Sequence, residues 1–96
     1  MAKSYLVCRL HILDKDRYQS TRFVFQRLAE AFGAKLIARS ESAVTLEGQP
    51  PGGVLIVFEY PDLPSLQRCL RSPEYEEARG LLRDAITADV WIVDGT

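Results

Sequence analysis

The sequence predicts an α+β fold in which a four-stranded antiparallel sheet carries helices on one face. A strand-like alternation opens the chain at residues 5–13, and an almost continuous apolar run occupies residues 54–60. Stretches with helical apolar periodicity follow both of them, and a last strand pattern lies near the C-terminus. The order βαββαβ results, and right-handed crossovers then put the first and third strands at the centre of the sheet. With 96 residues, we expect one domain covering residues 1–96.

The first strand has two unlike faces, because successive side chains of a strand point to opposite sides. One set of alternate positions is wholly apolar and is expected to face the core. It comprises Leu6, Cys8, Leu10 and Ile12. The other set mixes aromatic, charged and apolar groups, and it comprises Tyr5, Val7, Arg9, His11 and Leu13.

The next elements have recognisable starts and ends. Residues 14–16 contain two aspartates that can begin a helix, which we expect to run to about Phe32, and Gly33 follows where a left-handed cap is common. Residues 35–39 form a short predicted strand. Residues 43–47 are expected to continue it after a polar break, and the glycine- and proline-rich residues 48–53 form a loop.

The apolar run at residues 54–60 is typical of a central strand that is covered on both faces. Asp62 is placed to cap a second helix. Ser72 and Pro73 then restart the helix, because serine accepts a first-turn hydrogen bond and proline suits a position that needs no N–H. Residues 62–85 are therefore expected to form two helical pieces with a bend, followed by a strand at 87–93.

Composition excludes several classes of function. The 12 basic and 13 acidic residues are interspersed and give a net charge of −1, so no basic face for nucleic acid is expected. No apolar run approaches the roughly 20 residues that span a bilayer, and a cytoplasmic location is expected. Cys8 and Cys69 stand apart and are expected to be buried thiols, and His11 is the only histidine. We therefore expect no metal site and no cofactor.

The sheet face without helices is the expected place for a partner. Alternation assigns Val7, Leu13 and Trp91 to this face, together with one set of side chains from the central strand. A monomer seldom exposes such an apolar patch, so we expect a homodimer formed through this face.

The same alternation gathers polar groups on that face, at Arg9, His11, Arg39, Glu59 and Asp89. In one interpretation they line a small-molecule pocket, with His11 as the catalytic acid or base and with Arg9, Arg39, Glu59 and Trp91 binding the ligand. In the other interpretation the charges only pair across the dimer interface, and Trp91 is an interface anchor. A register shift of one residue would exchange the two faces.

Several short motifs, in order along nearly the whole chain, resemble the bacterial family called domain of unknown function 1330, within the dimeric α/β-barrel superfamily. They are the strand ending at residues 14–16 with Tyr18 after it, Phe32-Gly33, Arg39, Leu46-Glu47-Gly48, Glu59-Tyr60-Pro61, Ser72-Pro73-Glu74-Tyr75 and Val93-Asp94-Gly95. The chain departs from the family pattern at Ser40-Glu41 and at Gln49–Gly53. The resemblance implies a ferredoxin-like protomer that pairs sheet to sheet as a dimeric α/β barrel. It supplies no reaction, although the wider superfamily includes cofactor-free monooxygenases and isomerases.

Two functions therefore stay open at this stage. The first is a homodimer that binds a small carboxylated or oxygenated metabolite at the sheet face, as a cofactor-free isomerase or monooxygenase-like enzyme. The alternative is a non-catalytic dimeric structural or interaction module. The sequence does not decide whether the protein is an enzyme.

Overall fold

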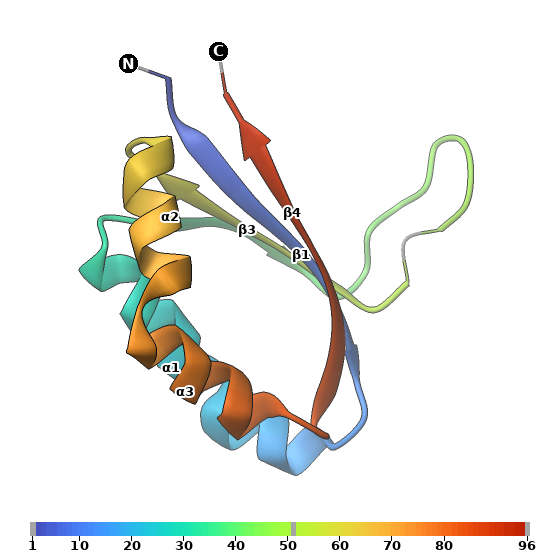
Figure 1. Cartoon of the computed structure of the whole chain (residues 1–96). Helices are drawn as coiled ribbons and strands as arrows, with labels where there is room; N and C mark the ends of the chain where they lie inside the picture. The colour runs from blue at the N-terminus through green and yellow to red at the C-terminus, as the bar shows by residue number, and fades with distance from the viewer. Residues whose placement is uncertain (1, 51, 96) are drawn as a thin grey trace.

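A computed structural model describes residues 2–50 and 52–95 of the chain. Its strands and helices are β1 Ser4–Ile12, α1 Lys15–Ala31, β2 Lys35–Ser40, β3 Val54–Tyr60, α2 Leu63–Arg71, α3 Pro73–Leu82 and β4 Ile86–Asp94. The sheet order is β2-β3-β1-β4, and every neighbouring pair is antiparallel. The predicted βαββαβ order is confirmed, with the two helical pieces α2 and α3 and with β1 and β3 at the centre (Figure 1).

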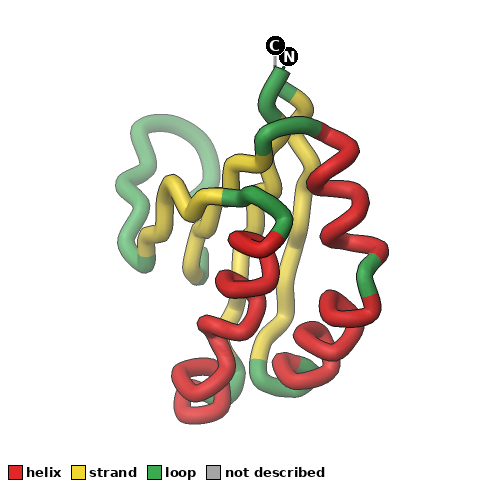
Figure 2. The backbone as a smooth tube through the Cα atoms, turned by 90° about the vertical axis from the view of Figure 1, so that its left-hand side faces the viewer, coloured by secondary structure: helices red, strands yellow, loops and turns green. Residues whose placement is uncertain are grey.

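The helices form one layer on a single face of the sheet (Figures 1 and 2). The all-apolar face of β1 points into this layer, and Leu6, Cys8 and Leu10 are each less than a tenth exposed. They pack in the same core cluster as Phe58 of β3 and Leu66 of α2. The prediction that Leu6, Cys8 and Leu10 face the core is therefore confirmed. No helix of the described residues covers the other face of the sheet.

Capping side chains fix the three helix starts. Asp14 Oδ1 accepts a hydrogen bond from the Arg17 amide at 3.1 Å, and Asp62 Oδ1 accepts one from the Ser65 amide at 2.8 Å. Ser72 Oγ accepts one from the Tyr75 amide at 3.2 Å. Each bond satisfies a first-turn N–H that has no partner within its helix. The helix starts predicted at residues 14–16, Asp62 and Ser72 are thus confirmed, with Asp14 as the cap of the first.

The predicted strand at residues 43–47 is wrong, because β2 ends at Ser40 and residues 41–50, 52 and 53 form no strand. Ser40 pairs with Leu55 and β3 begins at Val54, so the pairing of β2 with β3 ends at this point. Proline cannot donate to a ladder, and residues 43–47 find no pairing partner. The loop projects from the sheet on the side away from the helices (Figures 1 and 2).

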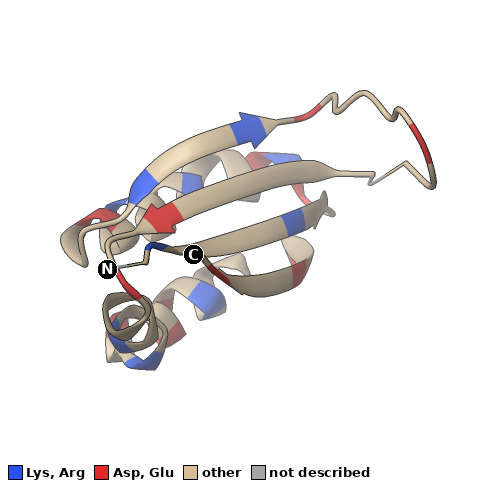
Figure 3. Cartoon of the chain, turned by 90° about the horizontal axis from the view of Figure 1, so that it is seen from above, with Lys and Arg blue, Asp and Glu red and all other residues tan. Residues whose placement is uncertain are grey.

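Basic and acidic residues alternate over the strands and helices rather than gathering by sign (Figure 3). Among residues 2–50 and 52–95, no helix has the length and apolar character needed to cross a membrane.

Candidate functional site

The sheet face without helices, here called the open face, carries most of the predicted polar group. Arg9 lies opposite Asp89, Tyr5 lies opposite Glu59, and Val7 lies opposite Trp91. Paired residues of an antiparallel ladder project on the same side, and His11 follows Arg9 by two positions. The predicted placement of Arg9, His11, Glu59, Asp89 and Trp91 on one face is therefore confirmed. Their roles in binding or catalysis stay predictions.

Charges on the open face are already paired within the chain. Arg9 donates from Nε and Nη2 to Asp89 Oδ2, with the Nε bond at 3.1 Å. Its guanidinium carbon also lies 5.7 Å from the centre of the Trp91 ring, within the range of a cation–π contact. Glu59 Oε1 lies 3.5 Å from Lys3 Nζ. These contacts agree better with structural ion pairs than with a ligand site on this face.

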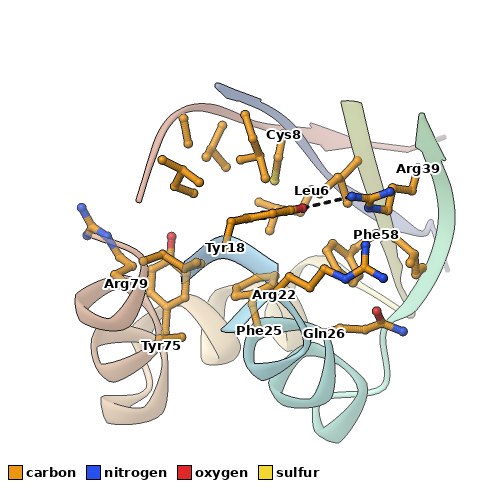
Figure 4. A pocket seen from close by; sticks show the side chains of 18 of the residues that line it. Leu6, Cys8, Tyr18, Arg22, Phe25, Gln26, Arg39, Phe58, Tyr75 and Arg79 are labelled. Atoms are coloured by element: carbon orange, nitrogen blue, oxygen red, sulfur yellow. Dashed lines mark hydrogen bonds between the residues drawn. The ribbon is translucent and has the colours of Figure 1, made fainter. Parts of the chain in front are cut away.

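Arg39 does not join this group, so its predicted position on the open face is wrong. In β2, Leu36 pairs with Phe58 and Ala38 pairs with Val57, which leaves Ile37 as an extra residue in a β-bulge. A bulge of one residue reverses the sides to which all later side chains point. Arg39 therefore pairs with Ile56 and projects towards the helices, where its Nη2 donates to the Tyr18 hydroxyl at 3.3 Å (Figure 4).

Arg39 lines a cavity of about 640 Å³ that lies between the sheet and the helix layer (Figure 4). Side chains from all four strands form one wall, and side chains from α1, α3 and the residue after α3 form the other. The lining residues are Leu6, Cys8, Leu10, Tyr18, Arg22, Phe25, Gln26, Leu36, Arg39, Ile56, Phe58, Tyr75, Ala78, Arg79, Leu82, Arg83, Ile86, Ala88 and Val90. The volume lies within the range of about 300–1,000 Å³ that is usual for small-molecule sites.

The apolar part of the lining is built around an aromatic group. The Phe25 ring meets the Phe58 ring edge to face, with centroids 5.3 Å apart, and it meets the Tyr75 ring in the same way at 5.7 Å. Such contacts hold the rings in fixed orientations and leave flat apolar surfaces on which a planar ligand can pack. Burial raises the pKa of the Tyr75 phenol, so this side chain is neutral at physiological pH.

The charged part of the lining is entirely basic. Four arginines border the cavity, Arg22, Arg39, Arg79 and Arg83, and the described lining includes no aspartate or glutamate. Two acidic partners lie outside the cavity: Glu41 is 3.4 Å from Arg39, and Glu76 is 3.7 Å from Arg79. Both carboxylates are more than three-fifths exposed, so solvent screens these pairs. The cavity is therefore electropositive.

The Tyr18 hydroxyl organises the basic end of the cavity. Tyr18 is 2% exposed, and its oxygen accepts the bond from Arg39. That bond raises the pKa of Arg39, because it favours the cationic form of the guanidinium. Among the residues that the structure describes, no acceptor takes the proton of the Tyr18 hydroxyl, so this O–H remains available to a ligand.

Sequence reasoning missed the contributions of α1. Arg22 and Gln26 follow the buried Tyr18 by four and eight residues along α1 and share its side of the helix. The four-residue spacing from Tyr18 was the available signal. Tyr75 and Arg79 of α3 and Arg83 at its C-cap repeat the same spacing.

Cys8 lies on the sheet wall of the cavity and is 8% exposed. Burial raises the pKa of its thiol from 9.0 to about 11. The predicted buried state of Cys8 and of Cys69 is confirmed, because both are free and buried. A thiol with so high a pKa is a poor nucleophile near neutrality, so Cys8 is a packing residue of the cavity wall.

Within residues 2–50 and 52–95, no three histidine, cysteine, aspartate or glutamate side chains lie together as metal ligands would.

Solved structures with the same fold include several proteins of unknown function. One from Rhodopseudomonas palustris has a TM-score of 0.75 and 15% identity, over 99% of this chain and 83% of its own. A protein from Thermobifida fusca, described as dimeric and ferredoxin-like, has a TM-score of 0.64 and 9% identity, over 97% of this chain and 91% of its own. At such identities these likenesses show the fold alone.

A third similar structure has a described activity. SnoaB from Streptomyces nogalater, a cofactor-independent oxygenase, has a TM-score of 0.65 and 16% identity, over all of this chain and 95% of its own. No curated protein sequence matches the chain. The family described as "Domain of unknown function (DUF1330)" matches residues 3–96. The chain therefore belongs to the DUF1330 family and has a ferredoxin-like fold.

Proposed function

We propose that this protein binds a small carboxylated or oxygenated metabolite with an apolar body, in the cavity between its sheet and its helices. The observation that carries the proposal is the composition of the described lining, in which four arginines and four aromatic rings surround the space without an acidic side chain. Arginine binds carboxylates and other oxyanions by parallel hydrogen bonds, and aromatic walls favour planar apolar groups. The proposed site thus moves from the open face to the opposite side of the sheet.

The size of the cavity supports a metabolite rather than a macromolecule. A space of about 640 Å³ accepts one or two fused rings with their substituents. Leu6, Ile56 and Leu82 provide apolar contacts in the lining. A ligand that is acidic at one end and apolar elsewhere satisfies both parts of the lining.

Cofactor-free oxygenation or isomerisation of such a ligand is the finer form of the proposal. The likeness to SnoaB supports this reaction class by fold alone. Either reaction needs a group that binds or moves a proton at a ligand oxygen, and the Tyr18 hydroxyl lies in the lining beside Arg39. His11 lies on the open face and has no part in this form of the proposal.

The protein is further proposed to act as a homodimer joined through its open face. Trp91 and Val93 are each nearly half exposed there, and Val7, Leu55 and Val57 extend the same surface across β1 and β3. Covering such a patch favours association, and the sheet-to-sheet dimer is the arrangement that the superfamily resemblance implies. The alternative, a dimeric module without catalysis, is favoured by the ion pairs that already satisfy Arg9 and Glu59.

Two fluorescent probes test the binding site. Anilinonaphthalene sulfonate is an aromatic anion, and phenylnaphthylamine is its neutral counterpart without the sulfonate. Ala88→Phe places a bulky side chain in the cavity, whereas Thr87→Phe places the same side chain on the other face of β4. We expect Ala88→Phe to weaken binding of both probes at least tenfold and Thr87→Phe to change it less than twofold. Equal effects of the two variants would refute the cavity as the site.

A further inference from the structure

One polar atom in the cavity lining lacks a hydrogen bond. Arg22 Nε is buried, and no described residue of the chain accepts its N–H. The Arg22 guanidinium carbon lies 4.5 Å from the centre of the Phe23 ring, so the plane of the group is supported by a cation–π contact. The donor is thus buried and supported on one side, yet unpaired.

An unpaired cationic N–H in a buried position is unfavourable, because it has lost its water and gained no acceptor. Proteins satisfy nearly all such groups, and the exceptions call for a reason. An acidic group in the cavity would supply the missing acceptor. Arg22 and Arg39 reach the same side of the cavity from α1 and β2, with Gln26 beside them (Figure 4).

Arg79 of α3 differs from this pair. Arg79 is 63% exposed, contacts Glu76, and lies at the opposite side of the cavity (Figure 4). Its guanidinium carbon is 5.8 Å from the centre of the Tyr75 ring. Water and Glu76 already satisfy Arg79, whereas Arg22 Nε has neither. The side of the cavity formed by α1 and β2 is therefore where a bound anion would supply a missing hydrogen-bond acceptor.

We infer that Arg22 and Arg39 form a clamp for a single acidic group of the ligand, while its apolar body lies against Phe25 and Phe58. Arg22 donates from Nε, and Arg39, held by the Tyr18 hydroxyl, donates from its guanidinium. Two such donors match the two oxygens of a carboxylate. The inference rests on the proposed function and adds to it the position of the acid and the class of substrate, an aromatic or other apolar carboxylic acid.

The two probes also test the clamp, because only one of them carries an acid. We expect Arg22→Gln to weaken binding of anilinonaphthalene sulfonate at least tenfold and to leave binding of phenylnaphthylamine within twofold. Arg39→Gln should act in the same way. The matched control is Arg27→Gln, which removes the same charge from an exposed position of α1 outside the lining. It should change neither affinity more than twofold.

A lysine variant of Arg22 tests whether the clamp needs the Nε donor as well as the charge. Arg22→Lys keeps the charge but loses the Nε donor, so its affinity for the sulfonate should fall between those of the wild type and Arg22→Gln. The clamp is overturned if Arg27→Gln weakens sulfonate binding as much as Arg22→Gln does, or if Arg22→Gln weakens both probes equally. Failure of the proposed function would look different, because Ala88→Phe would then leave both probes bound.

Discussion

At the scale of single residues, Tyr18 holds Arg39 on the cavity side of β2. The phenol oxygen accepts a hydrogen bond from Arg39 Nη2 at 3.3 Å, and the tyrosine itself is 2% exposed. A rigid, buried acceptor restricts the long arginine side chain, so less freedom is lost when a ligand binds. Tyr18 is on this basis a positioning residue, and its free O–H is a second contact for the ligand.

Tyr18→Phe should therefore weaken binding of anilinonaphthalene sulfonate about threefold to tenfold, since a hydrogen bond of this kind contributes roughly 1 kcal/mol. Binding of phenylnaphthylamine should change less than twofold. Fluorescence titration measures both affinities, and Tyr5→Phe on the open face serves as the control. Unchanged sulfonate binding would show that Tyr18 neither positions Arg39 nor contacts the acid.

The buried thiol of Cys8 makes stability depend on alkaline pH. Its pKa is about 11 in the folded chain against 9.0 in the exposed state, so the unfolded chain releases the proton first as pH rises. The contribution of the protonated thiol is complete below about pH 9 and is lost between about pH 9 and 11. From pH 7 to 10.5 the free energy of unfolding should fall by about 2 kcal/mol through Cys8.

Urea unfolding of the wild type and of Cys8→Ala at pH 7 and 10.5 measures this contribution. The variant should be less stable at both pH values, because a small void replaces the sulfur. Its free energy of unfolding should fall by about 2 kcal/mol less between pH 7 and 10.5 than that of the wild type. Tyr60 and Tyr75 also have raised pKa values and act in the same direction, and they are present in both proteins. Equal falls in the two proteins would contradict the burial effect at Cys8.

At the scale of elements, Ser72 joins α2 to α3. Its Oγ accepts from the Tyr75 amide and donates to the Cys69 carbonyl oxygen at 2.7 Å, so one side chain satisfies the end of one helix and the start of the next. Ser72→Ala leaves both groups without these partners. The free energy of unfolding should fall by about 1–2 kcal/mol, as for other helix caps.

Denaturant unfolding measures this loss, and Ser20→Ala provides a matched control. Ser20 is exposed on α1, and its hydroxyl contacts only the Arg17 carbonyl oxygen within the same helix. The control should change stability by less than about 0.5 kcal/mol. A loss at Ser72 no larger than that at Ser20 would mean that the cap is not needed at the bend.

Local sequence patterns predict the helices and most strands of this fold, but they do not predict which side chains meet in the cavity. Caps at Asp14, Asp62 and Ser72 depend on residues within four positions of each other, so the sequence predicts them. The position of Arg39 depends on how β2 pairs with β3. Ile37 carries no glycine or proline signal for a bulge, so plain alternation places Arg39 on the wrong face.

The roles of the other predicted residues depend on pairings between distant strands. Arg9 and Asp89 are both visible as charges in the sequence, but only the register of β1 against β4 brings them together. Arg22 was missed for a different reason. A helix face is judged by its apolar residues, and an arginine between two of them is normally assigned to solvent.

At the scale of the whole molecule, the two faces of the sheet differ in what they present. The face under the helices holds the cavity, and the open face presents apolar side chains from β1, β3 and β4. The loop between β2 and β3 projects on the open side, with Val44 87% exposed and Leu46 95% exposed (Figure 1). Both features suit a second copy of the chain packed against this side.

Val57→Lys should therefore convert a dimer to a monomer, because it puts a charge at the centre of the proposed interface. Val24→Lys adds the same charge to the exposed side of α1 and should leave the dimer intact. Native mass spectrometry distinguishes the two states directly. A monomeric wild type, or dimers of both variants, would contradict association through the open face.

The position of a bound ligand is the most direct test of the cavity. We would determine a crystal structure of the full chain with bromonaphthoate, in which the bromine marks the apolar body by its anomalous scattering. The bromine is expected between the sheet and the helices near Phe25 and Phe58, with the carboxylate at Arg22 and Arg39. A bromine peak on the open face beside Arg9 and Trp91 would contradict the proposed site and restore the one first expected from the sequence.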